Sequence, residues 1–236
     1  MNKMASTVLV VVLLPMLVLA DFDVYFLRHG ETTWNQERRL QGSISNTVLT
    51  AKGVRMAEET AKGMRKVGVS FDRVYTSPYL RASRTAEIVT DGSGLVPVRD
   101  ERIREMCFGK YEGQVYGKGQ WPDENLRFFF EDSDRYVPQG KDAESFAQVQ
   151  ARLRDFVERE LRPLDGKVGC VLCVSHALVL KSIVREFGDD SVRDVPLQRN
   201  CSVSILHYAG GKFTIREIGK VYYDIAEFEE STPSRR

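Results

Sequence analysis

The sequence predicts an α/β fold, a three-layer sandwich in which a mostly parallel sheet with an antiparallel edge carries helices on both faces. Three observations support this prediction. Short apolar runs typical of buried strands alternate along the chain with segments of helical periodicity, as in right-handed βαβ units. Two of these apolar runs end in a histidine. Near the C-terminus, two further apolar runs flank Ala209-Gly210-Gly211, as the strands of a hairpin do.

Apolar spacing and turn residues place the individual elements. Thr50 is a plausible N-cap, and Ser77-Pro78 predicts a helix start because Pro fits the first helical turn and Ser caps it. The expected order is a strand over 24–27, a helix over 50–68, a strand over 72–76, a helix over 77–90, a short strand over 97–99, an irregular insertion over 100–141, a helix over 142–163, a strand over 168–174, a helix over 177–187 and hairpin strands over 203–207 and 213–216.

The first 20 residues differ from the rest of the chain. Lys3 precedes a largely apolar, uncharged run from Val8 to Ala20, which is typical of a signal peptide and shorter than the about 20 residues that span a membrane. We therefore interpret residues 1–20 as a signal peptide, 21–225 as one domain and 226–236 as a polar tail. A cleaved signal implies a secreted or extracytoplasmic protein with no stable membrane association. The alternatives are an uncleaved anchor, a buried segment, or an over-long start ahead of a cytoplasmic enzyme.

Composition and charge exclude several classes of protein. Lys plus Arg (34) and Asp plus Glu (33) nearly cancel, so the net charge of +1 offers no long-range attraction to nucleic acid or anionic lipid. Hydrophobic residues make up 42% of the chain and charged residues 28%, which argues against disorder and against fibrous classes. Any binding of an anion must therefore come from a local cluster of cations. The oligomeric state is not predicted.

The four cysteines are too few and too scattered for a disulfide scaffold. Cys170 and Cys173 have a CxxC spacing, but they lie in an expected buried strand, where side chains three positions apart point to opposite faces. We therefore expect packing rather than zinc binding or redox chemistry. Asn200-Cys201-Ser202 matches a glycosylation sequon, which matters only if a eukaryotic secretory cell makes the protein.

The candidate site lies where two strands end. One strand runs into Arg28-His29 and a later one into Ser175-His176. Because ligands in open α/β sheets bind beyond the carboxyl ends of the strands, we expect His29 and His176 to lie close together. The third histidine of the chain, His207, lies on an alternating strand without a motif, and we expect it to pack.

Four segments carry a resemblance to a known family. Leu27–Asn35 resembles the signature of the histidine phosphatase (phosphoglycerate mutase-like) superfamily, and Ser77–Ala86, Glu105–Gly113 and Val174–His176 are similar to its other three elements, in the same order and spacing. The resemblance covers about residues 22 to 219. It implies that His29 is the nucleophile and Glu105 the proton donor, with His176 a further catalytic residue. It also implies that the phosphoryl group is bound by Arg28, Asn35, Arg81 and His176.

The chemistry of these residue types agrees with such roles. A transferring phosphoryl group carries negative charge on three oxygens, and Arg28 and Arg81 are permanently charged donors that stabilise it. We find no carboxylate spacing for Mg²⁺ and no His/Cys set for zinc, so we predict neither metal nor cofactor. Glu105 is chosen over Glu101, Glu112, Glu124 and Glu131 only by its place before Phe108-Gly109 and Glu112-Gly113. Arg84, which lies on the same expected helix as Arg81, could instead be a solvated surface charge without a role in the site.

Further features favour one branch of the family. Glu105–Gly113 and Pro138–Ser145 are similar to the phosphatase forms of these segments, and Glu31-Thr32 argues against the acid phosphatases and phytases of the second branch. We therefore expect a metal-independent phosphomonoester hydrolase with a phosphohistidine intermediate and a small phosphorylated substrate. The alternatives are a cofactor-dependent phosphoglycerate mutase and a non-catalytic phospho-ligand binding protein.

Two departures from the family pattern bear on the choice of substrate. Ala177 stands where the family usually has Gly, and the loop 42–48 lacks the usual acidic residue and proline. Trp121 and Phe128–Phe130 of the insertion could line the entrance, but we expect them to pack in the core. The substrate itself is not predicted.

Overall fold

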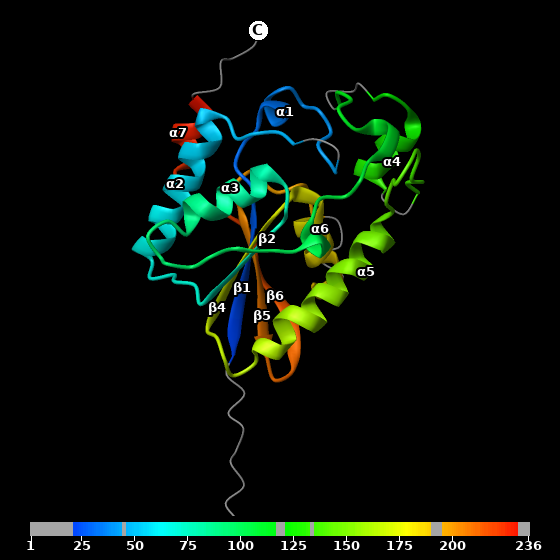
Figure 1. Ribbon diagram of the computed structural model, residues 1–236. Helices are drawn as coiled ribbons and strands as arrows, with labels where there is room; N and C mark the ends of the chain where they lie inside the picture. Colours follow the sequence, from blue (N-terminus) through cyan, green and yellow to red (C-terminus); the bar gives the residue numbers. More distant parts are fainter. Residues whose placement is uncertain (1–20, 44–45, 117–120, 133–134, 190–194, 231–236) are drawn as a thin grey trace, which may run out of the picture.

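The structure is a computed structural model that describes residues 21–43, 46–116, 121–132, 135–189 and 195–230 (Figure 1). The expected signal peptide lies outside the described residues. The strands are β1 (Phe22–Arg28), β2 (Arg73–Thr76), β3 (Val98–Arg99), β4 (Cys170–Ser175), β5 (Val203–Ala209) and β6 (Lys212–Lys220). The α-helices are α1 (Thr33–Gln36), α2 (Ala51–Lys66), α3 (Leu80–Val89), α4 (Glu124–Glu131), α5 (Phe146–Phe156), α6 (Ala177–Phe187) and α7 (Ile225–Glu230).

The strands form one sheet in the order β3-β2-β4-β1-β5-β6. β3, β2, β4 and β1 are parallel neighbours, whereas β5 and β6 add an antiparallel edge. β1 and β4 lie side by side in register, so that Arg28 at the end of β1 is opposite Ser175 at the end of β4. The predicted fold class is therefore confirmed, and the two strands that precede His29 and His176 end at the same edge of the sheet.

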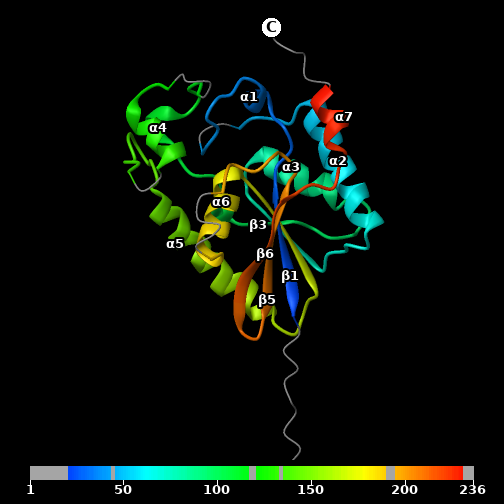
Figure 2. The same cartoon turned by 180° about the vertical axis from the view of Figure 1, so that it is seen from behind.

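Helices cover both faces of the sheet, α2, α3 and α7 on one and α5 and α6 on the other (Figures 1 and 2). The alternation along β1 explains the two layers, because successive side chains of a strand point to opposite faces. Val24 and Phe26 pack in the cluster with α5 and α6, and Tyr25 and Leu27 pack in the cluster with α2 and α3.

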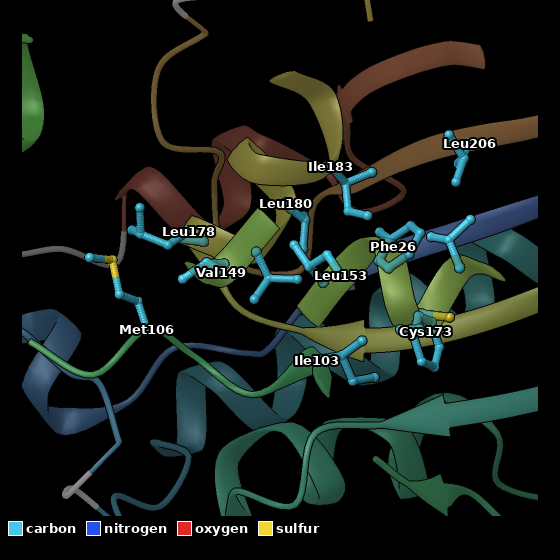
Figure 3. Close-up of a cluster of buried hydrophobic side chains, with 14 of the residues drawn as sticks. Phe26, Ile103, Met106, Val149, Leu153, Cys173, Leu178, Leu180, Ile183 and Leu206 are labelled. Carbon is cyan, nitrogen blue, oxygen red and sulfur yellow. The ribbon is translucent and has the colours of Figure 1, made fainter. Parts of the chain in front are cut away.

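The two cysteines of the CxxC spacing lie on opposite faces of β4, as predicted. Cys173 is fully buried in the cluster between β4, α5 and α6, beside Phe26 (Figure 3). Cys170 packs against the other cluster. Both are free thiols. Their side chains therefore contribute to two separate hydrophobic layers.

Two helices begin later than predicted. Ser77 does not cap α3, which starts at Leu80 after Tyr79, because the Ser77 hydroxyl contacts His176 (2.7 Å) and accepts from the N–H of Tyr79 (3.3 Å). α5 starts at Phe146 rather than near Asp142, whose φ of 58° is left-handed and non-helical.

Two expectations about the middle and the end of the chain also need revision. The insertion 100–141, expected to be irregular, contains the 3₁₀ turns η1 (Glu101–Ile103) and η2 (Gly109–Tyr111) and helix α4. The expected polar tail from residue 226 begins inside α7, because Phe228 is buried against Tyr223, with ring centroids 5.2 Å apart. Among the described helices, none combines the length and the apolarity needed to cross a membrane.

Candidate active site

The site lies at the carboxyl ends of β1 and β4, the upper end of the sheet in Figure 1. The backbone N–H of His29 donates to the carbonyl of Ser175 (3.0 Å), which ties the two strand ends together. The ring centroids of His29 and His176 are therefore only 5.2 Å apart. A pocket opens beside them, lined by Arg28, His29, Asn35, Arg39, Leu40, Gln41, Glu105, Phe108, Tyr116, Phe129, Phe130, Ala177, Leu178 and Leu197.

The His29 ring is held in one tautomer. Its Nδ1 lies 2.8 Å from the carbonyl oxygen of Gly30, and because a carbonyl only accepts, Nδ1 carries the hydrogen. The second ring nitrogen, Nε2, then has a free lone pair. Burial and the nearby guanidiniums of Arg81 and Arg28 hold the pKa of His29 well below its usual range, so the ring is neutral at neutral pH. A neutral imidazole in this tautomer is a competent nucleophile.

Arg28 presents an unpaired donor at the site. Its Nη1 donates to the carbonyl of Gln198 (2.5 Å), but its buried Nε has no hydrogen-bond partner among the described residues. A buried charged donor without a partner is unfavourable unless a ligand satisfies it. Arg28 is therefore arranged to bind an anion.

Arg81 and His176 lie immediately behind the pocket lining, and both are fully buried. Arg81 Nε donates to Nδ1 of His176 (3.2 Å), and Arg81 Nη2 donates to the carbonyl of Gly42 (3.0 Å). Burial lowers the pKa of Arg81 to about 10, which keeps the guanidinium charged at neutral pH. These contacts thus link α3 to the start of α6 and to the loop after α1.

The tautomer of His176 is the opposite of that of His29. Because its Nδ1 accepts from Arg81, its hydrogen is on Nε2 and donates to the Ser77 hydroxyl (2.7 Å). Burial, with Arg81 next, holds the pKa of His176 well below its usual range. In this arrangement the ring orients Arg81. Its expected direct contact with a phosphoryl group stays a prediction.

Glu105 lies between η1 and η2, with its carboxyl group at the N-terminus of α6. Its oxygens accept from the N–H groups of Met106 (3.0 Å) and Leu178 (3.3 Å). The side chains of Met106 and Leu178 both lie at the same end of the buried cluster (Figure 3). Burial raises the pKa of Glu105, which favours the protonated acid. Glu105 is thus fixed in the pocket wall as a group that can both give and take a proton.

The other glutamates considered from the sequence have different positions. Glu112 accepts from the N–H groups of Gly42 (2.9 Å), Ser43 (2.8 Å) and Phe108 (3.1 Å), so it joins the loop after α1 to the 108–112 segment. The remaining three are exposed at the surface: Glu101, Glu124 and Glu131.

Asn35 belongs to α1 and directs its amide to the pocket. Its side-chain oxygen accepts from the N–H of Thr32 (3.1 Å) and from Nδ2 of Asn200 (3.2 Å). With the oxygen occupied in this way, the NH₂ group is the part left to bind a ligand. The six residues expected from the sequence thus converge on one region.

Sequence reasoning missed several residues of this region. Gln41 is buried in the pocket wall and accepts from the hydroxyls of Thr32 and Thr47, which leaves its NH₂ as a donor. Its place in a long polar loop directly after a strand end was a usable sign, since loops at such positions carry function. Ser77 and Asn200 gave no comparable sign, because their contacts are far away in the sequence.

The aromatic residues of the insertion divide between core and pocket. Phe129 is buried in the core as expected, but it also lines the pocket together with Phe130. Phe130 stacks on Tyr116, with centroids 4.9 Å apart, and Trp121 packs next to both. Ala177 lines the pocket as well, at the first position of α6. Within the part of the chain that the structure describes, no three His, Cys, Asp or Glu side chains gather as metal ligands would.

Comparison with known proteins identifies the family. The family model described as "Histidine phosphatase superfamily (branch 1)" matches residues 24–220, which include all four segments singled out in the sequence. The chain belongs to the histidine phosphatase superfamily. The resemblance inferred from the sequence is therefore confirmed.

Individual relatives within the histidine phosphatase superfamily carry different names. The chain is 34% identical over 186 residues to the probable phosphoglycerate mutase GpmB of Serratia proteamaculans, covering 77% of this chain and 83% of the relative. A phosphoglycerate mutase from Bacillus anthracis superposes with a TM-score of 0.74 at 25% identity, covering 89% and 98% of the two chains. A putative alpha-ribazole-5'-P phosphatase from Escherichia coli superposes with 0.70 at 25% identity, covering 86% and 98%. Mutases and phosphatases are both among its relatives.

Proposed function

We propose that this protein is a phosphomonoester hydrolase that works through a phosphohistidine on His29 and needs no metal. The observation that carries the proposal is the fixed tautomer of His29. Its Nδ1–H is bound to the Gly30 carbonyl, so the free lone pair is on Nε2. The guanidiniums of Arg81 and Arg28 lower the pKa of the ring, and Glu105, whose pKa is raised by burial, lines the same pocket. These are the components that metal-free transfer of a phosphoryl group requires.

The proposed reaction has two steps. First, Nε2 of His29 attacks phosphorus, the bond from phosphorus to the ester oxygen breaks, and the neutral acid of Glu105 gives its proton to the leaving oxygen. Second, water attacks the phosphohistidine, Glu105 takes a proton from this water, and the phosphorus–nitrogen bond breaks to release phosphate. Arg28, Arg81 and Asn35 stabilise the charge on the phosphoryl oxygens in both steps.

The pocket wall favours hydrolysis over mutase chemistry. A phosphoglycerate mutase must hold a carboxylate and a second phosphate beside the transferring group, and buried anions need cationic partners. Among the described lining residues, the cations are Arg28 and Arg39, and Arg39 already binds Glu37 (2.6 Å) and the Gly113 carbonyl (2.9 Å). The rest of the wall beyond the catalytic groups is largely apolar: Leu40, Phe108, Tyr116, Phe129, Phe130, Leu178 and Leu197.

The names of the relatives support a second candidate, phosphoglycerate mutase. One pair of assays separates the two. We expect the purified protein to release inorganic phosphate from p-nitrophenyl phosphate and from sugar phosphates in the presence of a metal chelator. We expect no interconversion of 2- and 3-phosphoglycerate, with or without 2,3-bisphosphoglycerate. Rapid interconversion that depends on the bisphosphate would establish the mutase instead, and absence of both activities would indicate a non-catalytic binding protein.

The Glu105→Gln variant tests the proton donor. Phosphorylation of the enzyme by an alkyl phosphate should slow by about 10²- to 10⁴-fold, because the alkoxide then leaves without a proton. With p-nitrophenyl phosphate the loss should be much smaller, since nitrophenolate is a stable leaving group. The measurement is the rate of phosphoenzyme formation in a single turnover, with Glu101→Gln as a control at an exposed neighbouring glutamate.

Glu105 should also give the wild-type enzyme a characteristic pH profile, which the Glu105→Gln variant should lack. Burial raises the pKa of Glu105, so the acid form persists above the usual carboxyl range. For an alkyl phosphate, kcat/KM should be constant below this raised pKa and fall as the pH rises through it. His29 adds no acid limb near pH 6.5, because its pKa lies well below that value. An alkaline limb that is unchanged in Glu105→Gln would exclude Glu105 as the donor.

A further inference from the structure

The loop that leads into β5, residues 198–202, contacts three of the proposed catalytic and binding residues. We infer that Asn200 in this loop is a positioning residue, which fixes the nucleophile His29 and the phosphate ligand Asn35 relative to each other. This inference rests on the proposed function for its reaction, but the contacts that support it do not depend on the choice between hydrolase and mutase.

The side chain of Asn200 bridges two separate segments of the site. Its Nδ2 donates to the backbone carbonyl of His29 (3.0 Å) and to Oδ1 of Asn35 (3.2 Å). An amide NH₂ has two hydrogens, so a single nitrogen can serve both acceptors. Asn200 thereby joins the end of β1 to α1.

The contact with Asn35 also decides which way the Asn35 amide faces. Because Oδ1 of Asn35 accepts from Nδ2 of Asn200 and from the N–H of Thr32, the oxygen is directed into the protein and the NH₂ toward the pocket. A flipped amide would present an oxygen to the phosphoryl group and repel it. Asn200 therefore selects the orientation in which Asn35 can donate to an anion.

The backbone around Asn200 is itself fixed. The carbonyl of Gln198 accepts from Arg28 Nη1 (2.5 Å), and the N–H of Cys201 donates to the carbonyl of Arg28 (3.1 Å). The hydroxyl of Tyr223, just before α7, donates to the carbonyl of Asn200 (3.0 Å). Cys201 is fully buried, with a φ of 53°. These contacts hold the loop rigid, as a positioning role requires.

The same amide is the acceptor of the sequon Asn200-Cys201-Ser202. A glycan on Nδ2 would remove one of the two hydrogens that His29 and Asn35 share and would have to fit against their contacts. Glycosylation of Asn200 is therefore incompatible with keeping both of these hydrogen bonds.

Asn200→Asp and Asn200→Ala test the inference, with Arg199→Ala as the matched control. Arg199 is the adjacent residue, and its guanidinium pairs with Glu229 (2.7 Å) at the surface. Asn200→Asp is nearly isosteric but places an acceptor opposite Oδ1 of Asn35. We expect both Asn200 variants to lose about 10- to 100-fold in kcat/KM on p-nitrophenyl phosphate, because small misplacements of reacting groups are costly. Arg199→Ala should stay within about twofold of the wild type.

A double-mutant cycle with Asn35→Ala separates positioning from general destabilisation. If Asn200 acts through Asn35, its replacement in the Asn35→Ala background should cost clearly less than in the wild type. Additive losses in this cycle, or wild-type kcat/KM in Asn200→Ala, would overturn the inference. Unchanged thermal unfolding of Asn200→Asp shows that the fold is retained.

Binding of inorganic phosphate, measured by calorimetry, gives a readout without turnover. Weaker phosphate binding by Asn200→Asp than by the wild type supports the positioning role, whether or not the wild type is an active hydrolase. A wild type that binds phosphate but hydrolyses no phosphomonoester would refute only the proposed function. The opposite result is also informative. If the wild type hydrolyses phosphomonoesters and the Asn200 variants keep the same phosphate binding and the same kcat/KM, only the positioning role is refuted.

Discussion

His29→Ala should abolish the phosphoenzyme and lower kcat/KM by on the order of 10⁴- to 10⁶-fold, the range seen when a covalent nucleophile is removed. The physical reason is that in the proposed reaction Nε2 of His29 bonds to phosphorus, and a methyl group at position 29 leaves no replacement. The partner histidine cannot substitute, because both ring nitrogens of His176 already contact Arg81 and Ser77. The measurement is rapid acid-free quenching with a ³²P-labelled substrate, followed by detection of acid-labile phosphate on the protein.

His207→Ala is the matched control for this experiment. His207 lies at the opposite end of the sheet, where its Nδ1 contacts Asp23 (2.7 Å), and the pairing of β1 with β5 keeps it away from the pocket. Its replacement should leave the amount of trapped phosphate unchanged. Acid-labile phosphate that persists in His29→Ala would refute the assignment of the nucleophile.

Arg81→Lys should lower kcat/KM by about 10²- to 10³-fold, even though it keeps the positive charge. Arg81 uses two nitrogens in different directions, Nε toward His176 (3.2 Å) and Nη2 toward the Gly42 carbonyl (3.0 Å). One ammonium cannot reproduce this planar set of donors, so charge stabilisation in the transition state suffers. Steady-state kinetics on p-nitrophenyl phosphate measure the loss.

Arg84→Lys is the control on the same helix. Arg84 is exposed and pairs with Glu87 (3.0 Å), which agrees with its interpretation as a surface charge. Its replacement should change kcat/KM by less than about twofold, since exposed ion pairs contribute little. If Arg81→Lys were as active as Arg84→Lys, the geometry of the Arg81 guanidinium would have no role in the reaction.

Elements with a strong local pattern could be predicted from the sequence. The apolar run of β1, the Thr50 cap of α2 and the span of α6 are encoded by neighbouring residues, and the structure has them as expected. Local rules failed at Ser77, because its hydroxyl binds His176, which lies 99 positions away in the sequence. The aromatic run of α4 concealed its helical period, since three successive Phe residues give no amphipathic pattern.

The residues of the candidate site also differ in whether the sequence reveals them. Arg28, His29 and Asn35 lie in one short motif, so their convergence follows from sequence proximity. Glu105 could be distinguished from Glu112 only by family resemblance, because the sequence does not reveal that Glu112 binds the backbone of Gly42 and Ser43. Asn200 could not be found at all, because its partners His29 and Asn35 are 171 and 165 positions distant.

The position of β1 in the sheet has a consequence for biosynthesis. β1 is the first strand of the chain, yet its two neighbours, β4 and β5, come from the last third. Arg28 and its partner Gln198 are separated by 170 residues, which a ribosome needs on the order of 10–30 s to add. During that time an apolar strand has no native partner and is open to aggregation. The candidate site, which includes Arg28, is therefore completed only when synthesis of the chain is nearly finished.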